Sequence, residues 1–202
     1  MKIKICGLTT LREADYLNQH KVDFAGFVLF FPKSKRNISI QKAEEIMNAL
    51  NPDIKKVAVV VSPSLEQIKE IQNSNFDYIQ IHGQLDSSVI PYISLPILKA
   101  FNVKDMEQYE TYKTCEQIAG YVFDAQEPGS GKTFDWSLVS KIPKDDKLLL
   151  LAGGLQPENV AMAIQNIHPD GVDVSSGVEY TEQPGKDPEK IRAFVTAVRT
   201  GQ

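Results

Sequence analysis

One short stretch decides the fold of this chain: Lys56-Val57-Ala58-Val59-Val60-Val61. It is an almost continuous apolar run, and it lacks the polar alternation of a strand with one face in water. Such runs are typical of strands buried on both faces of a parallel sheet. Pro63-Ser64 follows and introduces an amphipathic segment with Glu66 and Gln67 near its start, which is a helix-start signal. The stretch therefore predicts a strand followed by a helix.

The same pattern recurs in both directions along the chain. We expect eight strands, over Lys2–Cys6, Phe24–Phe30, Lys56–Val61, Tyr78–Ile81, Ile97–Ala100, Gly120–Asp124, Leu148–Ala152 and Gly171–Val174. We expect eight helical segments, over Leu11–His20, Ile40–Leu50, Leu65–Asn73, Ser87–Tyr92, Asp105–Tyr112, Trp136–Lys141, Pro157–Asn166 and Asp187–Thr200. Consecutive strands start about 20 to 30 residues apart, which fits one strand, one helix and two short loops.

These repeated units favour one fold class. An open, doubly wound α/β sheet is the structural alternative, but that architecture usually has about five or six strands. Eight units favour a closed (β/α)8 TIM barrel, near the lower length limit for that fold. No linker or low-complexity segment divides the sequence, so we expect residues 1–202 to form a single α/β domain.

The composition argues against several classes of protein. A chain of 202 residues with 42% hydrophobic residues can bury a core, and its formal net charge of -4 argues against nucleic-acid binding. No apolar run approaches the roughly 20 residues that span a membrane. Two distant cysteines and three scattered histidines match no metal-site spacing. Met1-Lys2-Ile3-Lys4 leads straight into a strand without a signal sequence, so we expect a cytoplasmic protein with free thiols.

Two reactive side chains stand at the ends of predicted strands. Cys6 ends the first strand, and Asp124 ends the apolar run that begins at Tyr121. Active sites of barrels lie at the carboxyl ends of the strands, so we expect both side chains at one cavity. A strand cysteine is often only a buried core residue, and a carboxylate ending an apolar strand is either functional or held by hydrogen bonds. Their positions favour an acid–base pair, in which the Cys6 thiolate would accept a proton from carbon.

Small residues follow the last two predicted strands. Gly153-Gly154 comes after the seventh strand, and Ser175-Ser176-Gly177 comes after the eighth. Their backbone N–H groups can approach an anion closely, and a helix that follows adds the positive end of its dipole. These glycines could also be simple tight turns. Their position after the seventh and eighth strands favours a phosphate site, which recurs there in this fold.

Three further polar residues are candidates for binding the substrate. Arg36 lies in the loop after the second strand, where an arginine is usually a solvated charge but can bind a carboxylate with its planar fork. Gln80 and His82 lie at the end of the fourth strand. His82 either orients the substrate or only bonds within its own turn.

Several motifs, taken in chain order, resemble the phosphoribosylanthranilate isomerase family. They cover nearly the whole chain and comprise Lys4-Ile5-Cys6-Gly7-Leu8-Thr9, Gln80-Ile81-His82-Gly83, Gly129-Ser130-Gly131-Lys132-Thr133-Phe134-Asp135-Trp136, Gly153-Gly154-Leu155-Gln156-Pro157-Glu158-Asn159-Val160 and Val172-Asp173-Val174-Ser175-Ser176-Gly177-Val178-Glu179. One departure concerns the loop after the second strand, which holds one residue more than the family pattern before Arg36. The pose of Arg36 is therefore open.

The resemblance implies an Amadori rearrangement of N-(5-phosphoribosyl)anthranilate in tryptophan biosynthesis, without a cofactor. By position, Asp124 matches the general acid that opens the ribose ring, and Cys6 matches the general base that takes the proton from C2. Arg36 matches the residue that contacts the anthranilate end. Gln80 and His82 match cavity residues, and the clusters after the last two strands match the phosphate site.

Other interpretations remain at this point. The related isomerase of histidine biosynthesis carries Asp where this chain has Cys6, and a metal-dependent sugar-phosphate epimerase lacks its ligands here. A non-catalytic barrel that binds a phosphosugar is an alternative of another class. Monomer and homodimer are both compatible with this fold.

Overall fold

The computed structural model describes residues 1–102, 108–124 and 145–201, and its strands form a closed parallel barrel. Each strand pairs with its neighbours in sequence, and the last strand pairs with the first. The strands are β1 (Lys2–Cys6), β2 (Phe24–Val28), β3 (Lys55–Val61), β4 (Tyr78–His82), β5 (Ile97–Asn102), β6 (Ile118–Asp124), β7 (Leu148–Leu151) and β8 (Gly171–Val174). The expected (β/α)8 barrel is confirmed.

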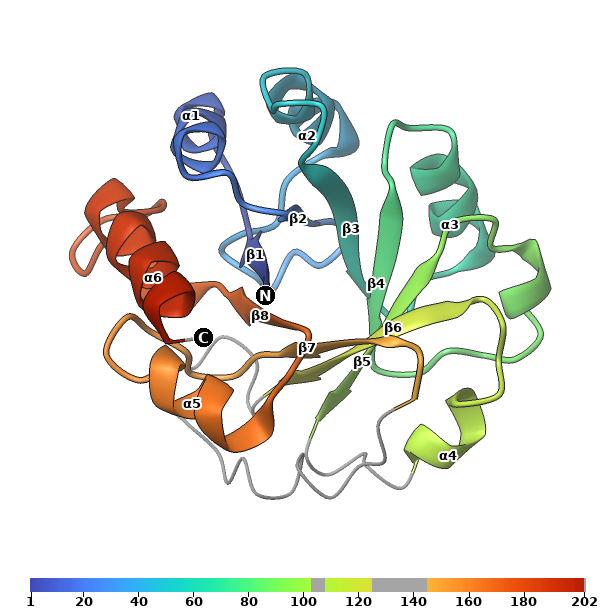
Figure 1. Ribbon diagram of the computed structural model, residues 1–202. Coiled ribbons are helices and arrows are strands. Elements are labelled where there is room, and N and C mark those ends of the chain that lie inside the picture. The colour runs from blue at the N-terminus through green and yellow to red at the C-terminus, as the bar shows by residue number, and fades with distance from the viewer. Residues whose placement is uncertain (103–107, 125–144, 202) are drawn as a thin grey trace.

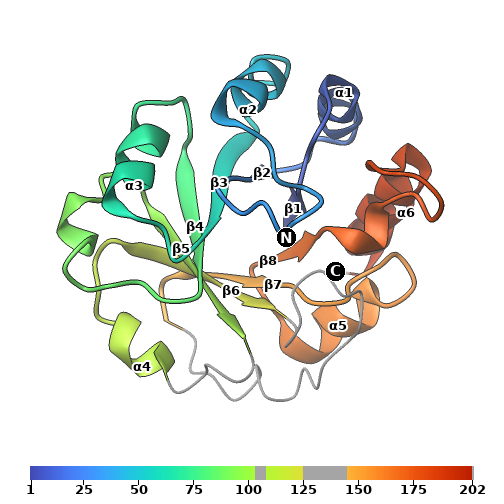
Figure 2. The same cartoon turned by 180° about the vertical axis from the view of Figure 1, so that it is seen from behind.

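Helices surround this ring of strands, as Figure 1 and the opposite view in Figure 2 show. The α-helices are α1 (Leu11–His20), α2 (Ile40–Met47), α3 (Leu65–Gln72), α4 (Tyr109–Tyr112), α5 (Val160–Ile167) and α6 (Pro188–Thr200). Among the described residues, short 3-10 helices are η1 (Ile90–Tyr92) and η4 (Ser176–Val178). In the part of the chain that the structure describes, no helix has the length and apolar character needed to cross a bilayer.

Local capping explains where several helices begin. The Ser39 hydroxyl accepts a hydrogen bond from the Lys42 N–H at the start of α2. Ser64 and Gln67 form a reciprocal capping box at the start of α3, as the stretch around Pro63 predicted. Asp187 caps α6 by accepting from the Glu189 N–H. These caps satisfy N–H groups that have no partner within the helix.

Successive side chains along each strand point alternately into two buried layers. One face of each strand packs against the helices in the larger core cluster, which includes Ile3 and Ile5 of β1. The other face points into the barrel, where the buried apolar residues are Cys6, Phe24, Val57, Val59, Leu98, Ala100, Val122, Leu150 and Ala152. The stretch 57–60 of β3 is therefore apolar because both of its faces are buried.

Some predicted boundaries are wrong. The strand expected to reach Phe30 ends at Val28, because Phe30 adopts a left-handed backbone with φ 56° and the chain turns there. The helix expected to reach Leu50 ends at Met47 and continues only as turns. The helix expected from Pro157 begins at Val160, after a turn.

The least accurate helix predictions lie in the middle of the chain. Ser87–Tyr92 is not an α-helix: it contains only η1, and Pro91 within that turn has no N–H for a helical hydrogen bond. Of Asp105–Tyr112, the described part contains α4. The predicted helix Trp136–Lys141 lies outside the described residues.

Candidate active site

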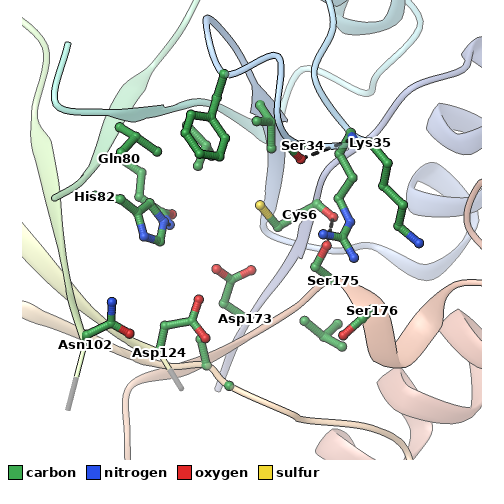
Figure 3. A pocket seen from close by; sticks show the side chains of 18 of the residues that line it. Cys6, Ser34, Lys35, Gln80, His82, Asn102, Asp124, Asp173, Ser175 and Ser176 are labelled. Atoms are coloured by element: carbon green, nitrogen blue, oxygen red, sulfur yellow. Dashed lines mark hydrogen bonds between the residues drawn. The ribbon is translucent and has the colours of Figure 1, made fainter. Parts of the chain in front are cut away.

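A cavity of about 640 Å³ opens at the carboxyl ends of the strands. It brings together nearly all the residues that the sequence analysis selected. These are Cys6, Arg36, Gln80, His82, Asp124, Gly153, Gly154, Ser175 and Ser176. Figure 3 shows the Cys6 thiol, the His82 ring and the Asp124 carboxyl around this shared space. Gly177 is not among the described residues that line it.

Cys6 and Asp124 enter the cavity from β1 and β6, which are not adjacent in the barrel. Both side chains stand at the last position of their strands. Burial raises the pKa of the Cys6 thiol, while Lys4 and Lys186 act in the opposite direction. The thiol therefore depends on nearby cations if it is to ionise.

Beneath Cys6 lies a buried ion pair that sequence reasoning missed. The Lys4 ammonium is 2.8 Å from Asp173 Oδ2, and both side chains are buried in the barrel interior. Asp173 also lines the cavity, and its second oxygen, Oδ1, has no hydrogen-bond partner among the described residues. We call Lys4, Asp173 and Cys6 the buried cluster.

His82 and Gln80 form a second polar pair on β4. The Gln80 amide nitrogen lies 2.8 Å from His82 Nε2. Burial, with the charges of Lys4 and Lys99, lowers the pKa of His82 to about 3. His82 is therefore neutral near pH 7, and with the Gln80 amide as donor its ring proton is on Nδ1. Gln80 Oε1 is buried without a partner among the described residues, so it can accept a bond from a ligand.

Arg36 is held at the cavity by Glu179, from the loop after β8. Arg36 Nε and Nη2 donate to the two oxygens of Glu179 at 2.5 and 3.1 Å. Lys35 and Lys186 bind the same carboxylate at 2.8 and 3.1 Å. Burial raises the pKa of Glu179, but these three cations outweigh it and lower the pKa to about 2. We call Glu179, Arg36, Lys35 and Lys186 the loop cluster.

The loops after β7 and β8 contain tight glycine turns and lie against each other. Gly153 and Gly154 have φ values of 93° and 64°, which favour glycine. Gly177 lets the two loops touch, since a Cβ atom there would lie 2.0 Å from the Leu155 carbonyl oxygen. Ser175 donates its hydroxyl to the Cys6 carbonyl and accepts from Lys186, so this hydroxyl already connects β1 to the loop cluster.

The sequence contains one feature that could have pointed to Lys4 and Asp173, namely their positions within the predicted strands. Alternation along β1 places Lys4 on the same face as Cys6, which in a closed barrel is the interior. Asp173 is likewise a charged residue within an otherwise apolar strand, Gly171–Val174. A charged residue in a strand otherwise indicates a solvent-facing side, and only the closure of the barrel reverses that inference.

The groups that line the cavity are of the kinds that can transfer protons. It offers a thiol, two carboxyl groups and a neutral imidazole within one space, with backbone turns suited to an anion at one side. Among the described residues, no three His, Cys, Asp or Glu side chains are grouped so that they could hold a metal ion.

Comparison with known proteins agrees with this geometry. Residues 3–197 match the family model described as N-(5'phosphoribosyl)anthranilate (PRA) isomerase. The chain belongs to the PRA isomerase family. It is an isomerase of tryptophan biosynthesis built on a TIM barrel, as the sequence motifs predicted.

Relatives with this family name match nearly the whole chain. The N-(5'-phosphoribosyl)anthranilate isomerase of Streptococcus gordonii is 40% identical over 202 residues, covering 99% of this chain and 98% of that protein. The crystal structure of the Thermotoga maritima enzyme is 36% identical, with a TM-score of 0.88 and 99% coverage of both chains. A PRA isomerase in complex with reduced 1-(o-carboxyphenylamino)-1-deoxyribulose 5-phosphate is 34% identical, with a TM-score of 0.85 and the same coverage.

Proposed function

We propose that this PRA isomerase converts N-(5'-phosphoribosyl)anthranilate to 1-(2-carboxyphenylamino)-1-deoxyribulose 5-phosphate by acid–base catalysis alone, without a cofactor. The observation that carries the proposal is that Cys6 and Asp124 line one cavity together with the glycine turns after β7 and β8. The complex of a relative with the reduced form of this product supports the choice of substrate. We further propose that residues 1–202 act as one domain and that the protein works in the cytoplasm, where Cys6 stays reduced.

In the first step, Asp124 acts as the general acid. Its proton passes to the ring oxygen of the ribose, the bond between that oxygen and C1 breaks, and the nitrogen of the anthranilate donates electrons to form a Schiff base. Protonation of a leaving oxygen by a positioned acid typically accelerates a reaction by about 10²–10⁴-fold.

In the second step, the Cys6 thiolate acts as the general base. It removes the proton from C2, the electron pair moves to the Schiff base nitrogen, and an enolamine forms. This enolamine tautomerises to the ketone when C1 gains a proton and the C2 hydroxyl loses one. No oxidant or reductant is needed, because the reaction only moves protons and electron pairs within the substrate.

The two ends of the substrate would be held by different loops around the cavity. The backbone around Gly153, Gly154, Ser176 and Gly177, with Ser175, would bind the phosphate. Arg36 would bind the anthranilate carboxylate, because its guanidinium carries five N–H donors and Glu179 engages only Nε and Nη2. Gln80 and His82 would contact the sugar between these ends, through Gln80 Oε1 and the proton on His82 Nδ1.

The test is turnover, followed by the loss of fluorescence of N-(5'-phosphoribosyl)anthranilate when purified protein is added. We expect Cys6→Ala and Asp124→Asn each to reduce kcat by about 10²–10⁴-fold while the affinity for the reduced product analogue changes little. Cys115→Ser and Asp53→Asn serve as controls, because Cys115 and the exposed Asp53 do not line the cavity.

Near-normal turnover in a cavity variant would rule out the role assigned to that residue. Tight binding of the analogue by the unaltered protein without any turnover would instead support the non-catalytic phosphosugar-binding alternative.

A further inference from the structure

The buried cluster contains one cation and two acidic groups. Lys4 and Asp173 are paired neighbours on β1 and β8, and their side chains meet inside the barrel at 2.8 Å. Cys6 lies two residues after Lys4 on β1, so its side chain points to the same interior face. The Lys4 side chain is fully buried.

Gly26 on β2 shows how close the sulfur and the ammonium are. A Cβ atom added there would lie 2.9 Å from Cys6 Sγ and 3.1 Å from Lys4 Nζ. Both groups therefore lie against one backbone position, within about 6 Å of each other, where an opposite charge favours the ionised form of an acid. Lys4 thus has a carboxylate and a thiol as neighbours.

One buried cation can neutralise only one of these two acids. A second anion would have to share that cation, because Lys186, the other buried cation near the thiol, is already held by Glu179 at 3.1 Å, and a buried charge without a counterion is strongly unfavourable. Burial raises the pKa of Cys6 and also that of Asp173, and Lys4 lowers both. Asp173 raises the pKa of Cys6 further, whereas Lys186, the other cation beside the thiol, lowers it.

We propose that Lys4 is a shared counterion, paired with Asp173 while Cys6 is a thiol and paired with the sulfur when Cys6 is a thiolate. The exchange transfers one proton: the S–H bond of Cys6 breaks, and an O–H bond forms on the unpartnered Oδ1 of Asp173. Total charge in the cluster stays the same, so the thiolate forms without adding a charge to the interior. Lys4 and Asp173 are then positioning residues that act through Cys6, and their role rests on Cys6 being the base.

The reactivity of the Cys6 thiol tests this directly, without an assay of turnover. In a Cys115→Ser background, Cys6 is the one remaining thiol of the sequence. Its rate of alkylation by iodoacetamide, measured by intact-protein mass spectrometry from pH 5 to 10, reports the fraction of thiolate.

Removing the competing acid and removing the cation are expected to shift this profile in opposite directions. Asp173→Asn leaves Lys4 to the sulfur alone, so the midpoint falls by about one pH unit or more. Lys4→Met removes the counterion, so the midpoint rises by a similar amount. The double variant, Lys4→Met with Asp173→Asn, has neither charge, avoids an isolated buried carboxylate, and is expected to have a midpoint well above that of Asp173→Asn.

Matched controls come from the surface of the same strand. Lys2 pairs with Asp23 at the same distance of 2.8 Å, but the Lys2 side chain is 56% exposed. Lys2→Met and Asp23→Asn should leave the profile unchanged. Circular dichroism checks that each variant is folded.

No downward shift in Asp173→Asn, or a midpoint of the double variant no higher than that of Asp173→Asn, would overturn the proposal. Its failure is distinguishable from failure of the proposed function. If Cys6→Ala keeps full turnover while the alkylation shifts appear, Cys6 is not the base but Lys4 is still the shared counterion.

Discussion

The buried cluster and the loop cluster lie at the same end of the barrel and are built in opposite ways. Lys4 and Asp173 come from strands, are buried, and leave Asp173 Oδ1 without a partner among the described residues. Glu179 comes from a loop, and each of its oxygens accepts bonds from two cations. Arg36 and Lys35 reach it from the loop after β2.

The difference indicates that the two carboxylates have different roles. A saturated carboxylate has no remaining acceptor for a ligand, so Glu179 fixes the loops and presents Arg36. An unsaturated carboxylate next to a thiol can exchange a proton, and rigid strands fix its position. The two clusters are connected by Lys186, which binds both Glu179 and Ser175, while Ser175 donates to the Cys6 carbonyl.

The largest effect should come from breaking the buried cluster. Lys4→Met leaves the Asp173 carboxylate buried without its cation, so we expect the free energy of unfolding to fall by about 3–5 kcal/mol. Urea unfolding measures this loss. The matched surface variant, Lys2→Met, should lose less than about 1 kcal/mol, because exposed ion pairs contribute little. Equal losses in the two variants would show that burial of the Lys4 pair has no energetic importance.

A smaller loss should follow from filling the space beside the same cluster. The added methyl group of Gly26→Ala meets Cys6 Sγ and Lys4 Nζ at about 3 Å and the Cys6 backbone at 3.2 Å. Overpacking of this kind costs typically about 1–3 kcal/mol, and displacement of the thiol should lower kcat. Combining Gly26→Ala with Cys6→Ala removes the sulfur, so the stability losses of the two changes should not add. Strict additivity would contradict the contact.

The features of the molecule that could be predicted from its sequence are those with a local signal. Continuous apolar runs such as Val57–Val61 predicted the strands, because a strand buried on both faces consists mostly of apolar residues. Cys6 and Asp124 followed from these strands, since the strand ends define the cavity edge. Ser87–Tyr92 was predicted wrongly because so short a segment carries little periodicity, and Pro91 within it has no N–H for a helical hydrogen bond.

The parts that could not be predicted depend on contacts between distant residues. Arg36 and Glu179 are 143 residues apart in sequence, so the pose of Arg36 had no local signal. Lys4 and Asp173 are 169 residues apart, and they meet only because β8 pairs with β1. Both clusters are thus consequences of barrel closure.

A more specific effect should follow from disturbing the loop cluster. Gly7 has φ 82°, and an added Cβ would lie 2.4 Å from Arg36 Cδ. Gly7→Ala should displace Arg36 and raise KM about tenfold with a smaller change in kcat, besides a backbone strain of about 1–2 kcal/mol. Steady-state kinetics measure the split. Arg36→Ala with and without Gly7→Ala is the control, because the added Cβ has no long Arg36 side chain to displace once Arg36 is truncated. A further rise of KM when Gly7→Ala is added to Arg36→Ala would mean that strain, and not Arg36, is responsible.

The smallest expected effect is a loss of stability at acidic pH. The pKa of Glu179 is lowered from 4.5 to about 2. Between these two pH values the carboxylate stays ionised in the native state, whereas in the unfolded chain it binds a proton. The loop cluster therefore stabilises the protein fully above about pH 5 and loses this contribution as the pH falls toward 2. Glu179→Gln lacks the charge, so its melting temperature at pH 7 should be about 2–4 °C lower than that of the unaltered protein.

This difference should shrink steadily between pH 5 and pH 3 in thermal unfolding. The contribution of Asp173 to stability changes with pH in the opposite direction. Burial raises the pKa of Asp173, so its ionisation in the native state lowers stability as the pH rises. Asp173→Asn should therefore not reproduce the acid-dependent convergence. A constant gap between Glu179→Gln and the unaltered protein down to pH 3 would mean that the cations of the loop cluster do not act on Glu179 through its charge.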